Sequence, residues 1–304
     1  MEEIGVIISR GFGVWKRNLN LCIPFLLNII ASMLVFLPIG AAIIVTVMPL
    51  ESLNNLNHTT LQDVQNVQAI QEILNQTEKS LASLPGQTIL QAAALFLVMI
   101  VLISLINSFF TAGAIGMVRQ ALDYGRSDTS SMWSAGRRHF LGLFLATLLI
   151  GLLTLAGMIF ILPGMIMGGA APSEDPQAIG LLVAGALLFI FYALALSVIL
   201  AAVPYALIVD EISPVQAIKQ SINFFRYNKF DVTVLWLLML AFSLGLQMIG
   251  GVAPTGSGAS GEPFSAITSM INLLVLAPLF NLWWTRLYMS RKGMLKTDEM
   301  EEPW

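Results

Sequence analysis

The chain has 304 residues, of which 57% are hydrophobic and only 11% are charged, and its mean hydropathy is +0.80. Soluble domains carry about 25% charged residues, so this composition excludes an ordinary soluble core. The net charge is −3 and no basic tract occurs, which argues against nucleic acid as a partner.

Six uncharged apolar runs follow one another along the chain, and each is long enough to cross a membrane. A helix needs about 20 apolar residues to span the hydrocarbon core. A β-barrel would show strands that alternate apolar and polar residues, and these runs do not alternate. The sequence therefore predicts an all-α, polytopic membrane protein whose residues 1–304 form one integral membrane domain. The predicted spans cover residues 20–49, 89–118, 140–166, 179–208, 232–251 and 265–285.

The lysines and arginines divide unequally between the two sides of these spans. Of the 15, only Lys79 falls on one side, and the other 14 lie in residues 1–19, 119–139, 209–231 and 286–304. Lys and Arg concentrate in cytoplasmic loops. We therefore expect a multi-pass protein of the cell membrane with both termini in the cytoplasm.

Short amphipathic stretches precede the first, third and fifth spans, at residues 4–18, 130–140 and 213–228. The last is the clearest, because Ser213, Pro214 and Gln216 form a capping-box pattern. Val215, Ile218, Ile222 and Phe225 then make one apolar face. Such a pattern is typical of a helix that lies in the membrane interface, although a plain basic loop would explain the charge equally well. The basic residues predicted to contact lipid headgroups are Lys16, Arg17, Arg137, Arg138, Lys219, Arg226 and Lys229.

These stretches give the chain a threefold organisation. The spans pair into three hairpins, and a cytoplasmic interfacial helix precedes each pair. On the outer side, residues 51–88 show helical spacing of apolar residues, which predicts an amphipathic helix that caps the bundle or meets a partner. Two glycosylation sequons, at Asn57 and Asn75, also lie there. They fit an outer location, but chance explains them equally well.

Residues 203–230 carry a resemblance to a known family. The residues concerned are Pro204, the acidic pair Asp210 and Glu211, the Ala217–Ser221 helix and the Arg226–Asn228 turn. They resemble the membrane domain fused to some glycerophosphodiester phosphodiesterases, and related stand-alone six-span proteins of bacteria and archaea. The resemblance implies a membrane fold. It does not imply phosphodiesterase activity, because spans fill the chain and leave no room for a catalytic barrel.

Few residues are suited to catalysis, so we expect no enzyme, no metal and no cofactor. His58 and His139 fall on opposite sides of the membrane, and no Cys/His cluster fits zinc. The G-x-G-x-x-G pattern at 256–261 lacks the strand and helix that the dinucleotide fingerprint requires. We interpret Asp210 and Glu211 as complementing the dipole of the helix that follows, rather than as an acid–base pair.

Neutral polar residues occur inside the spans, chiefly Asn28, Asn107 and Asn281. Such residues join helices to one another, or they line a path for a substrate. Several prolines also interrupt the spans, and broken helices can form binding sites. The small residues of Ala112-x-x-x-Gly116 would let two helices approach closely.

The resulting hypothesis is a non-enzymatic membrane scaffold or accessory subunit. Its partners would be membrane lipids, a membrane protein or a second copy of the chain, engaged through the cytoplasmic helices. The alternative is a channel or transporter for a neutral or lipidic solute. A lipid-modifying enzyme is the weaker third hypothesis, because titratable residues are so few.

Overall fold

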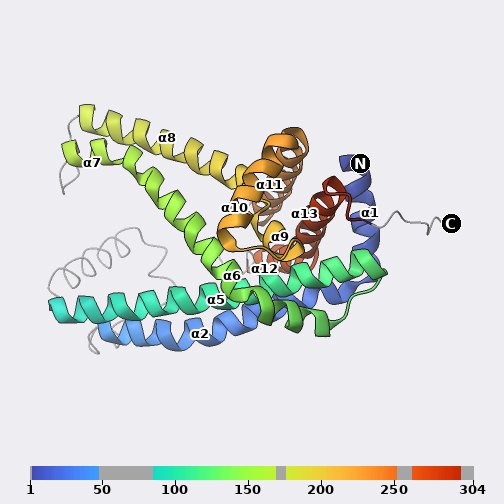
Figure 1. The fold of residues 1–304 in the computed structure, drawn as a ribbon. Helices are drawn as coiled ribbons and strands as arrows, with labels where there is room; N and C mark the ends of the chain where they lie inside the picture. Colours follow the sequence, from blue (N-terminus) through green and yellow to red (C-terminus); the bar gives the residue numbers. More distant parts are fainter. Residues whose placement is uncertain (1, 48–84, 169–175, 252–261, 296–304) are drawn as a thin grey trace. The chain divides into compact units, whose positions relative to one another are not determined.

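The computed structural model describes residues 2–47, 85–168, 176–251 and 262–295, and these residues form helices and no strands. Contacts divide the chain into two compact units. One comprises Met1–Leu27 with Ser108–Trp304, and the other is Asn28–Asn107. The helices are α1 (Ile4–Arg17), η1 (Leu19–Cys22), α2 (Ile23–Val47), α5 (Gly86–Tyr124), α6 (Thr129–Ala156), η3 (Gly157–Phe160), α7 (Leu162–Gly168), α8 (Pro176–Ile199), α9 (Val203–Val209), α10 (Pro214–Tyr227), α11 (Lys229–Gly251), α12 (Glu262–Ile271), η4 (Asn272–Leu276) and α13 (Ala277–Arg291) (Figure 1).

Within the described residues, six helical segments are long and apolar enough to cross a membrane. This confirms the prediction of an all-helical, multi-pass membrane protein. The segments are Leu19–Val47, Gly86–Tyr124, Thr129–Phe160, Pro176–Val209, Lys229–Met248 and Ile267–Arg291. The predicted outer helix at 51–88 falls almost entirely outside the described residues.

The stretch before the third span differs from the prediction. Residues 130–140 are not a separate helix but the first turns of α6, which runs unbroken from Thr129 to Ala156. No proline lies in this range, and Gly136 packs against the Phe109 ring rather than ending the helix. The prediction began the third span only after the charged residues Arg137 and Arg138, and therefore separated residues 130–140 from the helix to which they belong. Separate helices do precede the first and fifth spans, as α1 and α10.

Most of the prolines predicted to interrupt spans stand at the second residue of a helical segment. This is true of Pro24 in α2, Pro163 in α7, Pro204 in α9 and Pro278 in α13. Proline is tolerated in the first turn because its missing N–H has no partner there in any case. Pro38 alone lies inside a helix, α2, that continues through it.

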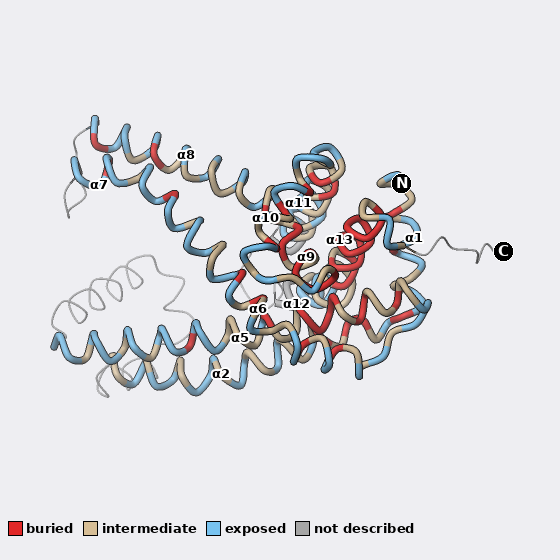
Figure 2. The backbone as a smooth tube through the Cα atoms, in the orientation of Figure 1, coloured by how far each residue is buried: buried red, intermediate tan, exposed pale blue. Residues whose placement is uncertain are grey.

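The core of the larger unit surrounds α13, which is buried along nearly its whole length (Figure 2). Every residue from Pro278 to Ser290 except Phe280 is buried. The helix packs against α1, α9 and η1. A helix that is covered on all sides is expected at the centre of a bundle.

Glycines allow the closest helix contacts in this unit. A Cβ added at Gly116 would lie 2.4 Å from the Cβ of Ala135, and one at Gly113 would lie 2.6 Å from Met132. The small-residue stretch at 112–116 therefore does bring α5 and α6 together, as predicted. On α1, a Cβ at Gly11 would lie 2.5 Å from Trp283 of α13.

The π-helical turn η4 interrupts the sixth span just before Pro278. The N–H of Ala277 bonds to the carbonyl of Asn272, five residues back. Pro278 has no N–H to offer to the carbonyl of Leu274, four residues before it. The thiol of Cys22 donates to that carbonyl instead, at 2.9 Å. The chain's one cysteine thus satisfies a backbone group that a proline leaves free.

The smaller unit contains the greater parts of α2 and α5. Its leucines, isoleucines and phenylalanines are mostly exposed, as with Leu34, Leu37, Leu90 and Leu97. Exposed apolar surface of this extent marks contact with a partner or with lipid, and the length of both helices identifies it as the lipid-facing surface of a membrane span.

Candidate functional site

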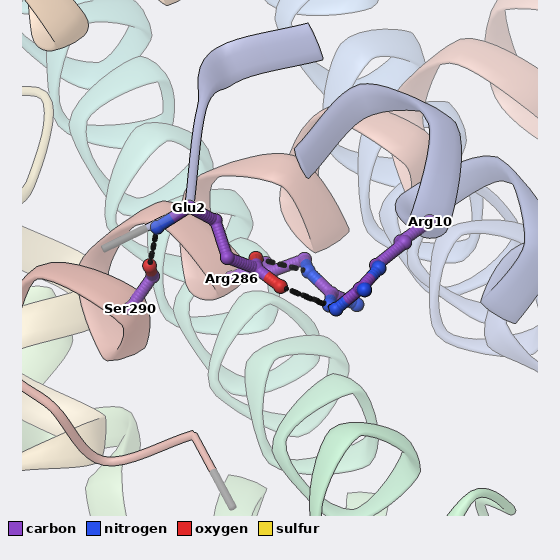
Figure 3. Close-up of polar contacts among 4 residues, drawn as sticks. All are labelled: Glu2, Arg10, Arg286 and Ser290. Carbon is purple, nitrogen blue, oxygen red and sulfur yellow. Dashed lines mark hydrogen bonds and ion pairs between the residues drawn. The ribbon is translucent and has the colours of Figure 1, made fainter. Parts of the chain in front are cut away.

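Charged residues of the larger unit gather where its spans begin and end, and the most buried of them is Arg286. Arg286 lies on α13 and is only 4% exposed. Its Nε and Nη2 atoms donate to the two carboxylate oxygens of Glu2, at 2.8 and 2.7 Å (Figure 3). Arg10 of α1 reaches the same carboxylate at 2.9 Å, and the Glu2 backbone N–H donates to Ser290 Oγ at 3.3 Å. These contacts join the start of the chain to the last span.

The arginines also determine the protonation of Glu2. The hydrogen bond from Arg286 lowers the pKa of the Glu2 carboxyl below its ordinary value. Partial burial acts in the opposite direction, but the positive charges of Arg286 and Arg10 add to the lowering. Glu2 is therefore ionised at neutral pH and balances the buried guanidinium.

The adjacent acidic residues Asp210 and Glu211 bind different helices. Oδ2 of Asp210 accepts a hydrogen bond from the Tyr288 hydroxyl at 2.5 Å and forms an ion pair with Lys292. Glu211 pairs with Arg138 of α6 at 2.5 Å and with Arg119 of α5 at 3.8 Å. The sequence interpretation, a complement to the α10 dipole, did not anticipate these partners. The turn between α9 and α10 thus connects α13 on one side and the α5 and α6 helices on the other.

A further ion pair joins the fifth and sixth spans. Arg291, at the end of α13, donates from Nε to Asp231 Oδ2 at 2.7 Å. Asp231 lies in the first turn of α11. Both residues line an open hollow of about 1070 Å³, which we call the headgroup hollow. The hollow is lined by Glu2, Glu3, Ile4, Gly5, Gln220, Asn223, Phe224, Tyr227, Asn228, Phe230, Asp231, Arg291 and Lys292.

Helix α10 has the capping predicted for it, but it buries a different face. The side chain of Gln216 accepts a hydrogen bond from the Ser213 N–H at 3.3 Å. The buried residues of α10 are Ala217, Ser221 and Phe224. The Ser221 hydroxyl donates to the Ile199 carbonyl at 2.8 Å.

The predicted apolar face of α10 lies beside the buried one and stays largely uncovered. Val215 is 54% exposed and Ile222 is 38% exposed, while Ile218 and Phe225 are half-buried. Ala217 and Ser221 thus let one side of α10 approach the protein closely, with Phe224 buried beside them, while Val215 and Ile222 remain exposed.

All seven basic residues predicted to meet lipid headgroups are exposed. Arg138 among them pairs with Glu211. They lie at the end of α1, in the first turns of α6, along α10 and at the start of α11: Lys16, Arg17, Arg137, Arg138, Lys219, Arg226 and Lys229.

The three intramembrane asparagines belong to separate settings. Asn28 Nδ2 donates to Asn107 Oδ1 at 3.2 Å, and both residues lie in the smaller unit. Asn281 is buried in the larger unit, where the Thr285 hydroxyl approaches its side-chain oxygen at 3.5 Å. The first pair has the geometry of a bond between two helices.

Several predicted features lie outside the described residues: His58, the sequons at Asn57 and Asn75, and the pattern at 256–261. In the part of the chain that the structure describes, no group of three or more His, Cys, Asp or Glu residues is placed to hold a metal ion.

Sequence reasoning missed the ion pairs of Arg286, Asp231 and Lys292 and the hydrogen bond of Tyr288, because each joins residues far apart in the chain. Arg286 follows the predicted sixth span directly, which made it look like an ordinary flanking charge. The one available signal was its position beside an uninterrupted apolar stretch, since an ionisable residue there requires a partner.

Comparison with known proteins relates the chain to one archaeal protein and to one family. An uncharacterized protein of Archaeoglobus fulgidus is 23% identical over 309 residues, which cover 96% of each chain. No solved structure matches. The comparisons show no link to the membrane domains associated with glycerophosphodiester phosphodiesterases, so that resemblance stays a prediction. A family model described as a domain of unknown function, DUF7847, matches residues 60–278, and the chain therefore belongs to this family.

Proposed function

We propose that this protein is a non-enzymatic scaffold or accessory subunit of the cell membrane that engages anionic lipids on its cytoplasmic side. The observation that carries the proposal is the surface of α10. Its apolar residues Val215 and Ile222 are exposed, and the exposed cations Lys219 and Arg226 lie on the same helix. The helix contains no acidic residue. An apolar stripe flanked by Lys and Arg is suited to the boundary between headgroups and acyl chains.

The side of the membrane follows from the same charges. Basic residues near anionic headgroups each contribute about 1 kcal/mol, and the basic side of a membrane protein faces the cytoplasm. A scaffold of this kind would hold a protein partner or a second copy of the chain against the lipid that it has gathered.

The test measures anionic lipid at the protein surface. The purified chain is placed in bilayers that contain spin-labelled phosphatidylglycerol, and the immobilised fraction is measured by electron paramagnetic resonance. Lys219→Gln and Arg226→Gln should each weaken the association by about fivefold, and high salt should do the same. Arg126→Gln removes one exposed cation from the turn after α5 and serves as the control. It should lower the immobilised fraction of lipid less than the two α10 variants do. Equal loss in all three variants would contradict the proposal.

A channel or transporter for a neutral or lipidic solute is the second candidate. It is favoured by the breaks in three spans, at η3, before α9 and at the π-helical turn η4, since π turns and interrupted helices occur often at functional sites. Vesicles that contain the protein would then accumulate or release one solute selectively. Such a result would replace the scaffold as the account of this protein.

A further inference from the structure

The headgroup hollow combines residues from three parts of the larger unit at the level where two spans end. Residues 2–5 form one wall, and residues of α10 from Gln220 to Tyr227 form another. The remaining wall is formed by the start of α11, at Phe230 and Asp231, and the end of α13, at Arg291 and Lys292. Because the fifth span begins and the sixth span ends here, the hollow lies beside the headgroup layer of the membrane.

The charges that line the hollow leave one carboxylate uncompensated. Glu2 binds Arg286, Asp231 binds Arg291, and Lys292 binds Asp210. Glu3 is exposed, and its side chain has no hydrogen bond or ion pair within the described residues. A cationic group can therefore bind without breaking an existing pair, whereas an anion would have to compete with the carboxylates that already hold Arg291 and Lys292.

Two aromatic side chains that line the hollow, one from α10 and one from α11, are almost fully uncovered. Tyr227 is 88% exposed and Phe230 is 76% exposed, and both line the hollow. Exposed apolar side chains that gather at one hollow mark a place of contact with a ligand, a partner or the membrane. The face of an aromatic ring attracts a cation placed within about 6 Å, so these rings add to the preference that Glu3 creates.

We infer that the headgroup hollow binds an organic ammonium group, held by the carboxylate of Glu3 and the ring faces of Tyr227 and Phe230. A metal ion does not fit between these three side chains, since it would require several clustered oxygen ligands and aromatic rings supply none. The ammonium group can come from a lipid headgroup of the ethanolamine or choline type, or from a soluble amine. This inference is independent of the basic residues of α10, and it holds whether the protein acts as a scaffold or as a transporter.

The experiment has a bilayer arm and a soluble arm. In the first, the protein is placed in nanodiscs of equal parts phosphatidylethanolamine and phosphatidylglycerol, and the lipids that it retains are identified by native mass spectrometry. In the second, tetramethylammonium is added to the protein in a non-ionic detergent, and magnetisation transfer from the protein to the methyl protons is measured by NMR.

The variants Glu3→Gln and Tyr227→Leu/Phe230→Leu test the site itself. Glu3 precedes α1 but makes no side-chain capping bond, so its replacement should not disturb the fold. The controls are Asp128→Asn and Tyr124→Leu, an exposed carboxylate and an exposed aromatic residue outside the hollow. Thermal unfolding of each variant verifies that it is folded.

We expect wild-type protein to retain phosphatidylethanolamine in preference to phosphatidylglycerol. Both site variants should lower that preference about threefold to fivefold, and the control variants should leave it unchanged. Transfer to tetramethylammonium that the site variants abolish would show that a soluble amine suffices. Preference in the bilayer without such transfer would identify the lipid headgroup as the source. The same lipid ratio in wild type and site variants, with no difference in transfer, would overturn the inference. So would displacement of the bound lipid by inorganic phosphate but not by tetramethylammonium.

Discussion

At the residue scale, the contact with the largest expected effect on stability is the ion pair between Glu2 and Arg286. Arg286 is almost fully buried, and Glu2 supplies both carboxylate oxygens to it. Desolvation makes such pairs weak contributors as a whole, but removing one partner leaves a charge that is buried and uncompensated. The pair therefore matters most through the cost of breaking it.

Replacing Glu2 with Gln should lower the free energy of unfolding by about 2–4 kcal/mol, because Arg286 then loses its counter-charge. The measurement is loss of helical circular dichroism on titration with a denaturing detergent. Glu3→Gln is the matched control, since this neighbouring carboxylate is exposed, and it should change stability by less than about 0.5 kcal/mol. Equal effects of the two substitutions would contradict the assigned pairing.

The lowered pKa of Glu2 also predicts a dependence of stability on pH. A carboxyl group whose pKa is lower in the folded state stabilises that state at every pH above the pKa of the unfolded chain. This contribution is lost as the pH falls through the lowered pKa of the folded protein. Unfolding midpoints measured from neutral to acidic pH should therefore fall, and the fall should be smaller in Glu2→Gln. An identical pH profile in the variant would show that other groups are responsible.

Cys22 stabilises the sixth span through a single hydrogen bond, to the Leu274 carbonyl that Pro278 leaves free. Cys22→Ala should cost about 1 kcal/mol because a partly buried acceptor loses its donor. Cys22→Ser keeps a donor at the same place and should cost less. The measurement is the free energy of unfolding of the two variants. An equal loss in both would show that Cys22 stabilises the protein through the volume of its thiol and not through its hydrogen bond.

At the scale of elements, the packing of α1 on α13 depends on the absence of a side chain at Gly11. An added Cβ would overlap Trp283, whose indole N–H donates to the Ile8 carbonyl at 3.3 Å. Gly13 lies one half-turn further along the same helix, and an added Cβ there would meet nothing within 4 Å. The two glycines therefore form a matched pair for testing this contact.

Gly11→Ala should destabilise the protein by about 1–3 kcal/mol, because it forces α1 away from α13. Gly13→Ala should instead stabilise it by up to about 1 kcal/mol, since alanine favours the helix over glycine. Thermal unfolding of both variants measures the difference in sign. If both substitutions stabilise the protein, α1 does not pack on α13 as described.

At the scale of the whole molecule, contacts between span ends support a common basic side. Within the larger unit, Asn18 Oδ1 accepts from the Ser127 N–H at 2.9 Å, which joins the start of the first span to the turn after the second. Glu211 joins the end of the fourth span to Arg138 at the start of the third. Asp231 and Arg291 join the fifth and sixth. These contacts bring span ends together in pairs, which is the arrangement expected if the ends lie on one face of the membrane.

Labelling of single cysteines with an impermeant maleimide tests this arrangement in intact cells. In a Cys22→Ser background, Ser130→Cys at the start of α6 should be unreactive until the membrane is opened, and Gln87→Cys at the start of α5 should react from outside. Both positions are exposed. The reverse pattern would place the basic face, and with it both termini, outside the cell.

The sequence by itself determined the class of this protein and the number and approximate place of its spans. Uncharged runs of about 20 apolar residues have one stable outcome in a membrane, because backbone groups must bond within each segment. Local chemistry also sufficed for the capping of α10 at Ser213 and Gln216, and for the close approach that Gly116 permits. These features depend only on residues that are near one another in the chain.

The tertiary structure decided which side chains meet. Periodicity identified the apolar face of α10, but Ala217 and Ser221 form the buried face because small side chains allow closer approach to neighbouring helices. Charge density suggested a separate helix at 130–140, although no local signal there interrupts α6. The bonds from Arg286 to Glu2, from Tyr288 to Asp210 and from Arg291 to Asp231 each join residues that lie 60 or more positions apart in the chain. Only the packing of α13 at the centre of the larger unit brings these charges together. A buried charge is costly unless an opposite charge pairs with it, and here the partner comes from a distant part of the chain.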